Sequence, residues 1–170
     1  MDHEDNHTKR RKKYIVDDGV TEEMLDKFAE QLRIYLRAMY PGCPSNARRK
    51  IVRRARDRSH FGRLSEKASF LTTNFARHAR TDYERLMRLH SLTREEARIV
   101  VSNEVMDIVD KWRKGAPVDH PGLEEIRGRF RNKRKIRQFD QNLIAEENTA
   151  LAEWMRCWLN GNAATEPDIF

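Results

Sequence analysis

Apolar side chains recur at intervals of three and four residues from residue 21 onward, the spacing that gathers them on one face of an α-helix. The first apolar stripe comprises Leu25, Phe28, Leu32, Tyr35, Leu36 and Met39. Thr21 is a suitable N-cap for this helix, and Glu22 and Glu23 suit the positive end of its dipole. The pattern therefore predicts a helix that starts after Thr21 and ends before Pro41 and Gly42.

Three further helices are predicted after residue 45, the last of them with Tyr83, Leu86 and Met87. Ser45 is the expected N-cap of a helix that runs to about Arg58, with a narrow apolar side formed by Ala47, Ile51, Val52 and Ala55. Ser65 is expected to cap the next helix, after a loop over residues 59–64, and Thr81 to cap a brief one.

The clearest helical signal begins at Thr93. Thr93 and Glu96 have the spacing of a capping box, in which the hydroxyl and the carboxylate each accept a hydrogen bond from a backbone amide at the helix start. One face of the following helix is apolar and comprises Ala97, Val101, Val105, Ile108 and Trp112. Gly115 is expected to end this helix.

The remainder of the chain divides into a linker and a second apolar pattern. Pro117, Pro121 and Gly122 mark the linker. Apolar residues from Leu123 to Trp158 then predict one long helix or two stacked ones. No segment alternates apolar and polar residues over the length of a strand, so the predicted fold is all-α.

These signals predict a small compact helical domain with a basic, partly extended C-terminal helical region. The helical domain is expected over residues 20–115 and the C-terminal extension over residues 116–160. Residues 1–19 form a basic tail with too little apolar surface to offset the entropy of ordering, and residues 161–170 form a second tail. Both tails are expected to be disordered.

Composition excludes several classes of protein. Charged residues make up 36% of the chain and apolar residues 38%, which supports only a modest core. The longest aliphatic run is Ile99–Val101, so we expect no membrane span and no signal peptide. Two cysteines, Cys43 and Cys157, argue against a disulfide framework and favour a reducing compartment. We expect an intracellular protein, in the cytoplasm or nucleoid of a bacterium or in the nucleus of a eukaryote.

Charge is unevenly distributed along the chain, whose net charge is +7. The segments 9–13, 44–63 and 127–137 contain 20 of the 34 basic residues and one acid, Asp57. The rest of the chain carries 14 basic and 26 acidic residues. Because a surface that only needs to be soluble mixes the two signs, this segregation is the main indication of function.

Three pieces of the chain resemble the domain of unknown function 2293 family, over roughly residues 40–113. They are the Cys43-Pro44 turn with Ser59, Gly62 and Arg63 beyond it, the stretch Ala76–Leu86 containing Arg77-His78, Thr81 and Tyr83, and Glu95–Arg98 leading to Trp112-Arg113. The resemblance implies a small helical domain without a known activity. It therefore transfers no functional residue to this chain.

The basic helix over residues 45–58 is the first candidate binding site. Guanidinium groups bind phosphates in a bidentate manner and keep their charge at neutral pH. The candidate residues on and after this helix are Arg48, Arg49, Arg53, Arg56 and Arg63. The alternatives are a solvated face, charges paired with the acid-rich first and fifth helices, or a helix-turn-helix that reads a sequence. No cluster of Asn and Gln for reading base edges accompanies these arginines, which favours contact with the backbone of a nucleic acid, DNA or RNA.

The segment 127–137 is the second candidate, since basic residues surround its whole helical circumference. Its candidate phosphate contacts are Arg129, Arg131, Lys133, Arg134 and Lys135. The alternative is an exposed helix between two packed ends. The basic run Lys9–Lys13 fits a phosphate-binding arm or a nuclear localisation signal, although short basic runs at termini are common.

Catalysis and metal binding have weaker support. Arg77, His78 and Tyr83 could form the centre of an enzyme if His78 pairs with Asp82 one helical turn later, but a structural role at a helix junction is favoured. The cysteines and histidines lack metal-binding spacing, and no glycine-rich phosphate loop occurs. We expect no enzymatic activity, no metal and no cofactor.

The last apolar pattern offers a different function. Trp154, Met155 and Trp158 have helical spacing, which usually means packing in the core, here against the first helix. They could instead anchor a homodimer or a protein partner, because tryptophan is common in such interfaces. The leading hypothesis is a protein that binds nucleic acid, and the alternative is an interaction or assembly module.

Overall fold

The computed structural model describes residues 20–117 and 141–162. In these residues every regular element is an α-helix, which confirms the predicted all-α fold. The helices are α1 (Glu22–Met39), α2 (Ser45–Asp57), α3 (Leu64–Arg80), α4 (Tyr83–Leu89), α5 (Arg94–Arg113) and α7 (Gln141–Asn162). The predicted N-terminal tail and the basic segment 127–137 lie outside the described residues.

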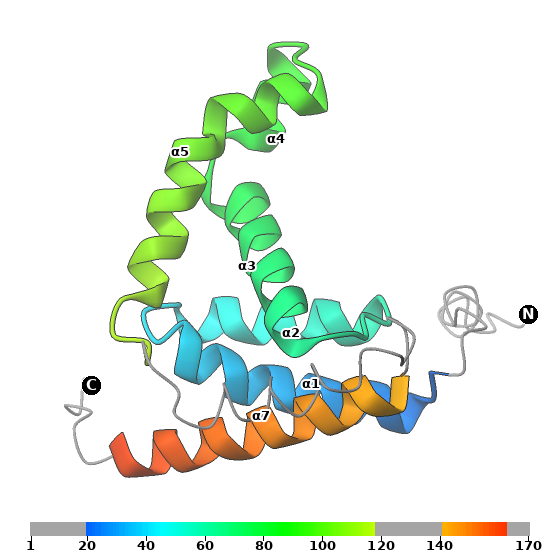
Figure 1. Cartoon of the computed structure of the whole chain (residues 1–170). Helices are drawn as coiled ribbons and strands as arrows, with labels where there is room; N and C mark the ends of the chain where they lie inside the picture. The colour runs from blue at the N-terminus through cyan, green and yellow to red at the C-terminus, as the bar shows by residue number, and fades with distance from the viewer. Residues whose placement is uncertain (1–19, 118–140, 163–170) are drawn as a thin grey trace, which may run out of the picture.

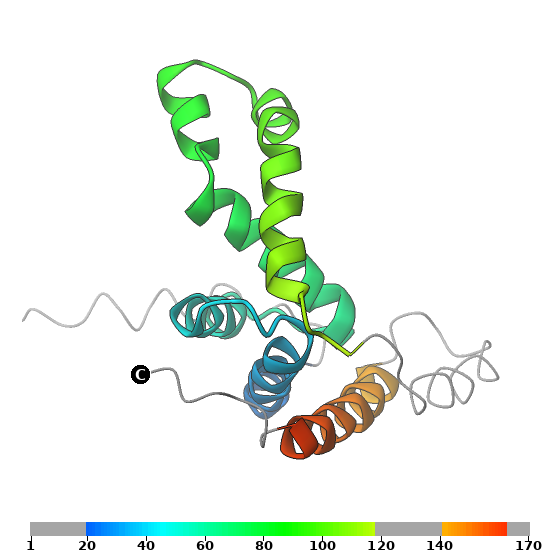
Figure 2. The same ribbon diagram turned by 90° about the vertical axis from the view of Figure 1, so that its left-hand side faces the viewer.

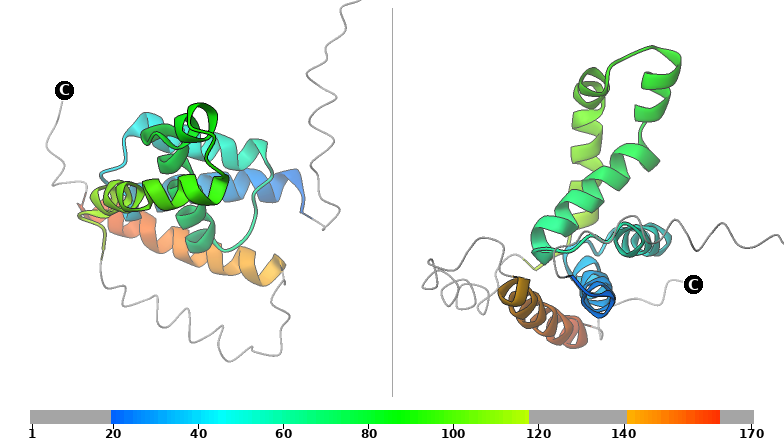
Figure 3. Two further views of the ribbon diagram at one scale, coloured as in Figure 1. Left: turned by 90° about the horizontal axis from the view of Figure 1, so that it is seen from above. Right: turned by 90° about the vertical axis from the view of Figure 1, so that its right-hand side faces the viewer.

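The helices are arranged as a layer and an arm. The layer consists of α2, α1 and α7, with α1 in the middle (Figures 1 and 2). The arm consists of α3 and α5, which rise from the layer and pack against each other, and of α4 at its far end. Seen from above, α7, α1 and α2 run side by side in that order (Figure 3). α1 therefore contacts helices on two sides within the layer, and it also contacts α3.

Burial follows from this arrangement. Most of the predicted stripe of α1 is inaccessible, since Phe28, Leu32 and Leu36 are each at most 1% exposed, whereas Met39 is partly buried. Ile51 of α2 and Met155 of α7 are buried in the same core. The stripe of α5 from Ala97 to Trp112 packs against α3, where the rings of Trp112 and Phe75 lie 6.4 Å apart.

The C-terminal end of α5, at the base of the arm, is fixed to the layer by a close approach at Gly42. The amide of Gly42 donates to the carbonyl of Trp112 over 3.0 Å. A β-carbon at this position would lie 2.7 Å from the carbonyl oxygen of Lys111. Only glycine fits here without a shift of backbone, because the turn between α1 and α2 lies directly against the end of α5.

α7 packs along α1, as the helical spacing of its aromatic residues predicts. Met155 is 1% exposed, and Trp154 and Trp158 are half-buried against the core. The side-chain amide of Gln31 donates a hydrogen bond to the hydroxyl of Thr149 over 3.1 Å, which adds a polar contact between the two helices. α7 also continues to Asn162, two residues into the predicted C-terminal tail.

Helix starts are confirmed at two predicted positions. The hydroxyl of Thr21 accepts a hydrogen bond from the amide of Met24 at the start of α1. Thr93 and Glu96 form the predicted capping box of α5, and these bonds to Thr93 lower the pKa of the Glu96 carboxyl.

The predicted caps at Ser45, Ser65 and Thr81 are wrong. Pro44 occupies the N-cap position of α2, because its carbonyl already accepts the amide of Arg48, and no side chain caps this helix. Thr81 ends α3 rather than starting α4, although its hydroxyl accepts the amide of Tyr83.

At α3 the cap comes from another helix. α3 starts at Leu64, before Ser65. The side-chain oxygen of Asn148 in α7 accepts the amide of Leu64 over 2.9 Å, and the side-chain nitrogen donates to the carbonyl of Gly62 over 2.9 Å. Asn148 is 1% exposed, so α7 holds the start of α3 from within the core.

Candidate functional site

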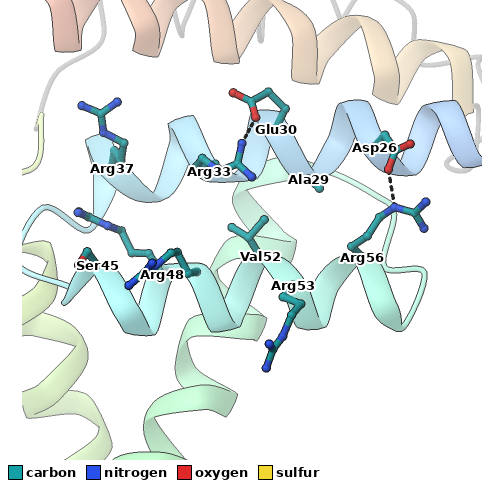
Figure 4. Close-up of a pocket in the computed structure, with 11 residues that line it drawn as sticks. Asp26, Ala29, Glu30, Arg33, Arg37, Ser45, Arg48, Val52, Arg53 and Arg56 are labelled. Atoms are coloured by element: carbon teal, nitrogen blue, oxygen red, sulfur yellow. Dashed lines mark hydrogen bonds and ion pairs between the residues drawn. The ribbon is translucent and has the colours of Figure 1, made fainter.

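A groove of about 600 Å³ lies between α1 and α2. Its floor is formed by the small apolar side chains of Ala29 and Val52 (Figure 4). The charged side chains along it are Asp26, Glu30, Arg33 and Arg37 from α1 and Arg48, Arg49, Arg53 and Arg56 from α2. Because the apolar stripes of both helices face the core, the charged flanks of α1 and α2 meet at this groove. We call it the arginine groove.

The two acids of the arginine groove are already paired. Asp26 accepts a hydrogen bond from Nε of Arg56 over 2.5 Å, and Arg56 also lies 3.8 Å from a carboxylate oxygen of Glu22. Glu30 pairs with Arg33 one turn along α1. These pairs are partly exposed, so each contributes little to stability, but together they use both negative charges of the groove.

Four of the arginines that line the groove have no ion pair among residues 20–117 and 141–162: Arg37, Arg48, Arg49 and Arg53. The side chain of Arg53 extends from α2 away from α1 (Figure 4). In Figure 4, Arg37, Ser45 and Arg48 lie at one end of the groove, whereas Asp26 and Arg56 lie at the other. A concave surface with an excess of positive charge concentrates anions, so the groove is suited to a phosphate-bearing ligand.

The structure separates the residues that the sequence grouped as binding candidates. Arg48, Arg49, Arg53 and Arg56 line the arginine groove. Arg63 lies at the start of α3, where its Nε is 3.7 Å from a carboxylate oxygen of Glu147 in α7.

The remaining candidates, Arg129, Arg131, Lys133, Arg134 and Lys135, lie outside the described residues. The prediction that they bind phosphates together with α2 stays a prediction.

Sequence reasoning missed Arg33 and Arg37. Both are exposed residues of α1 and lie on one flank of that helix, one turn apart. Their spacing is visible in the sequence. Their contribution to a site depends on the packing of α1 against α2, which a one-dimensional pattern does not contain.

The cluster of Arg77, His78 and Tyr83 joins α3 to α4. His78 pairs through Nδ1 with Glu84, not with Asp82, because α3 ends at Arg80 and Asp82 is not one helical turn beyond His78. The His78 ring contacts the buried ring of Tyr83 edge-on, with centroids 4.9 Å apart, and the Arg77 guanidinium lies 5.9 Å from the centre of that ring. These contacts hold a helix junction together.

Three further observations concern metal ligands, the thiol of Cys43 and membrane-spanning helices. No group of three or more His, Cys, Asp or Glu side chains is placed to hold a metal ion in that part of the chain. Cys43 is buried, and burial raises the pKa of its thiol to about 11 despite the nearby charges of Arg48 and Arg80. None of the described helices has the length and apolarity needed to cross a membrane.

The fold and the groove define an all-α protein with a basic surface between two of its helices. Residues 35–113 match the family model described as an uncharacterized conserved protein, the domain of unknown function 2293. This match confirms the family predicted for that segment from its motifs. Searches of curated proteins and of solved structures found no match.

Proposed function

We propose that the protein binds nucleic acid through phosphate contacts in the arginine groove. The observation that carries this proposal is the set of four arginine residues that line one groove and have no carboxylate partner in the described part of the chain. Guanidinium groups cannot lose their charge at neutral pH, so the groove is electropositive whenever it is empty. A phosphate backbone supplies the missing negative charges.

The lining of the groove favours binding that does not depend on base sequence. No Asn or Gln lines it, and its single hydroxyl belongs to Ser45. Base edges are commonly read by paired Arg, Asn or Gln contacts that project from an element within the major groove. The arginines of this groove lie between two helices, so phosphate contact is the chemistry that they support best.

The alternative function, an assembly module that docks through α7, lacks its central anchor. Met155 is buried against α1, and the two tryptophans beside it are half-buried in the same core. A partner could reach these residues only if α7 moved away from α1. The arginine groove requires no such rearrangement.

The test is a salt series of binding titrations with the full chain. Labelled duplex DNA of generic sequence, a single strand and a structured RNA are titrated at several salt concentrations. For binding to duplex DNA, log affinity should fall linearly with log salt, with a slope of about −0.9 for each phosphate neutralised. Arg49→Gln combined with Arg53→Gln should weaken binding to all duplex sequences about equally and reduce the magnitude of the slope by roughly 2.

The matched control removes the same charge elsewhere. Arg94 and Arg98 are exposed on α5 at the same i, i+4 spacing as Arg49 and Arg53. The double change of Arg94 and Arg98 to Gln should leave affinity and slope nearly unchanged. Equal losses in the two double variants would mean that net charge alone drives binding, and an affinity insensitive to salt would exclude phosphate contact; either result contradicts the proposal.

A further inference from the structure

A second surface lies where the loop after α2 meets α3. Phe70 of α3 is 56% exposed, although phenylalanine is among the residue types that are most often buried. The ring of His60 in the loop is half-buried, and its centroid lies 6.1 Å from that of Phe70, with the planes inclined by 60°. We call these two rings the ring patch.

Three basic side chains lie close enough to His60 to affect its protonation. Burial lowers the pKa of His60, and the charges of Lys67, Arg58 and Arg54 lower it further. The imidazole is therefore mainly neutral at pH 7, so the patch combines two uncharged rings with three cations. Glu66 is an exposed acid one turn before Phe70 on α3, and it forms no ion pair within the described residues.

Basic side chains of α2 lie at both the arginine groove and the ring patch. Arg49 and Arg53 of α2 line the groove, and Arg54 lies on the other flank of α2, close enough to act on His60. Lys50 is exposed on the solvent side between these flanks. A strand that crosses α2 can therefore follow basic side chains from the groove to the patch.

We propose that the ring patch stacks on an unpaired base of single-stranded nucleic acid, while the surrounding cations hold the phosphates on either side. This proposal rests on the proposed function, and it adds a preference for single strands to the general phosphate contact of the groove. Exposed aromatic rings stack on bases of any sequence, and the bases of a duplex are already stacked on one another. The rings and the cations thus select a ligand that offers both a free base and a charged backbone.

The test compares two single strands of equal length and charge, an ordinary labelled oligonucleotide and one in which the bases are absent. The intact protein should bind the ordinary strand more tightly than the abasic strand. Phe70→Ala should weaken binding to the ordinary strand about 5- to 150-fold, the range measured for loss of one base–aromatic contact. The same variant should leave binding to the abasic strand and to duplex DNA unchanged.

Two control variants separate stacking from a general loss of apolar surface. Phe70→Tyr keeps an aromatic ring and should keep the preference for the ordinary strand. Ile99→Ala removes a side chain that is 73% exposed on α5, and it should change no affinity.

The outcomes distinguish this proposal from the one on which it rests. If the intact protein binds the ordinary and abasic strands equally and with a strong salt dependence, the ring patch has no stacking role, whereas the arginine groove keeps its function. If Phe70→Ala weakens all probes equally, stacking is likewise excluded. If no probe binds, both proposals are wrong.

Discussion

α2 and α5 both bury one apolar stripe, but they present different surfaces to solvent. α2 contains six basic residues and one acid, Asp57. α5 contains four basic residues and five acids. α5 shows that this chain keeps a helix soluble by mixing the two signs, so solubility alone does not explain the surface of α2.

The two helices also start differently. α5 begins with a complete capping box and with Glu95 and Glu96 in its first turn. α2 has no side-chain cap and no acid in its first turn, and Arg48 and Arg49 follow close behind. Cations near the positive end of a helix dipole are unfavourable, and a bound anion removes that penalty. The comparison indicates that side-chain caps and acidic residues stabilise the start of α5, whereas no such interaction stabilises the start of α2.

The largest expected effect lies on the buried face of α5. Trp112→Ala should lower the free energy of unfolding by about 3–5 kcal/mol, because a large side chain that is 7% exposed leaves a cavity beside Phe75. Urea denaturation measures the change, and Ile99→Ala on the exposed face serves as its control. A neutral result for Trp112→Ala would mean that the buried face of α5 is assigned incorrectly.

The next largest effect concerns the contact by which α7 holds the loop that follows α2. Asn148→Leu should lower the free energy of unfolding by about 1–3 kcal/mol, since the amide of Leu64 and the carbonyl of Gly62 would both lose their buried partner. Asn160→Leu, at an exposed position of the same helix, should change little. Equal effects of the two changes would contradict a specific role for Asn148.

The different helix starts give a smaller and more direct contrast. Thr93→Ala should lower the free energy of unfolding by about 1 kcal/mol, the typical contribution of an N-cap side chain. Ser45→Ala should have almost no effect, because Pro44 occupies the N-cap position of α2 and no side chain caps that helix. Thermal unfolding of the two variants side by side measures the difference, and a larger effect at Ser45 would reverse the comparison.

The smallest effect is expected at the groove. Arg49→Gln combined with Arg53→Gln should change the free energy of unfolding by less than about 0.5 kcal/mol, because both side chains are exposed and neither has a carboxylate partner in the described chain. A loss well above that value would show that these arginines serve the fold, and it would undo the contrast between α2 and α5.

Local signals predicted most of the fold. The capping residues Thr21 and Thr93 and the stripe from Ala97 to Trp112 each depend on contacts within one helix, so sequence spacing is sufficient to find them. The cap of α3 was missed because Asn148 lies 84 residues from Leu64 and reaches it only through tertiary packing.

The candidate site was predicted in part for the same reason. The arginines of α2 stand out as a run of like charge, and four of them do line the groove. Which candidate arginines are paired depends on neighbours from other helices. Asp26 of α1 pairs with Arg56 of α2, and Glu147 of α7 pairs with Arg63, which precedes α3. Arg37 of α1 belongs to the site only because α1 packs beside α2.

α1 lies between α2 and α7, and the stretch that matches the family model includes only the end of α1 and none of α7. The unit that folds is therefore larger than the stretch that matches the family. The family match starts at Tyr35, inside α1, and ends before α7 begins. Phe28 and Leu32 lie before that stretch and Met155 lies after it, yet all three belong to one core. The polar contact between the side chains of Gln31 and Thr149 closes a separation of 118 residues, so docking of α7 carries a cost in loop-closure entropy and raises the contact order of the chain. A fragment limited to residues 35–113 would lack most of the helix around which the layer is built, and its cooperative unfolding transition would be lost.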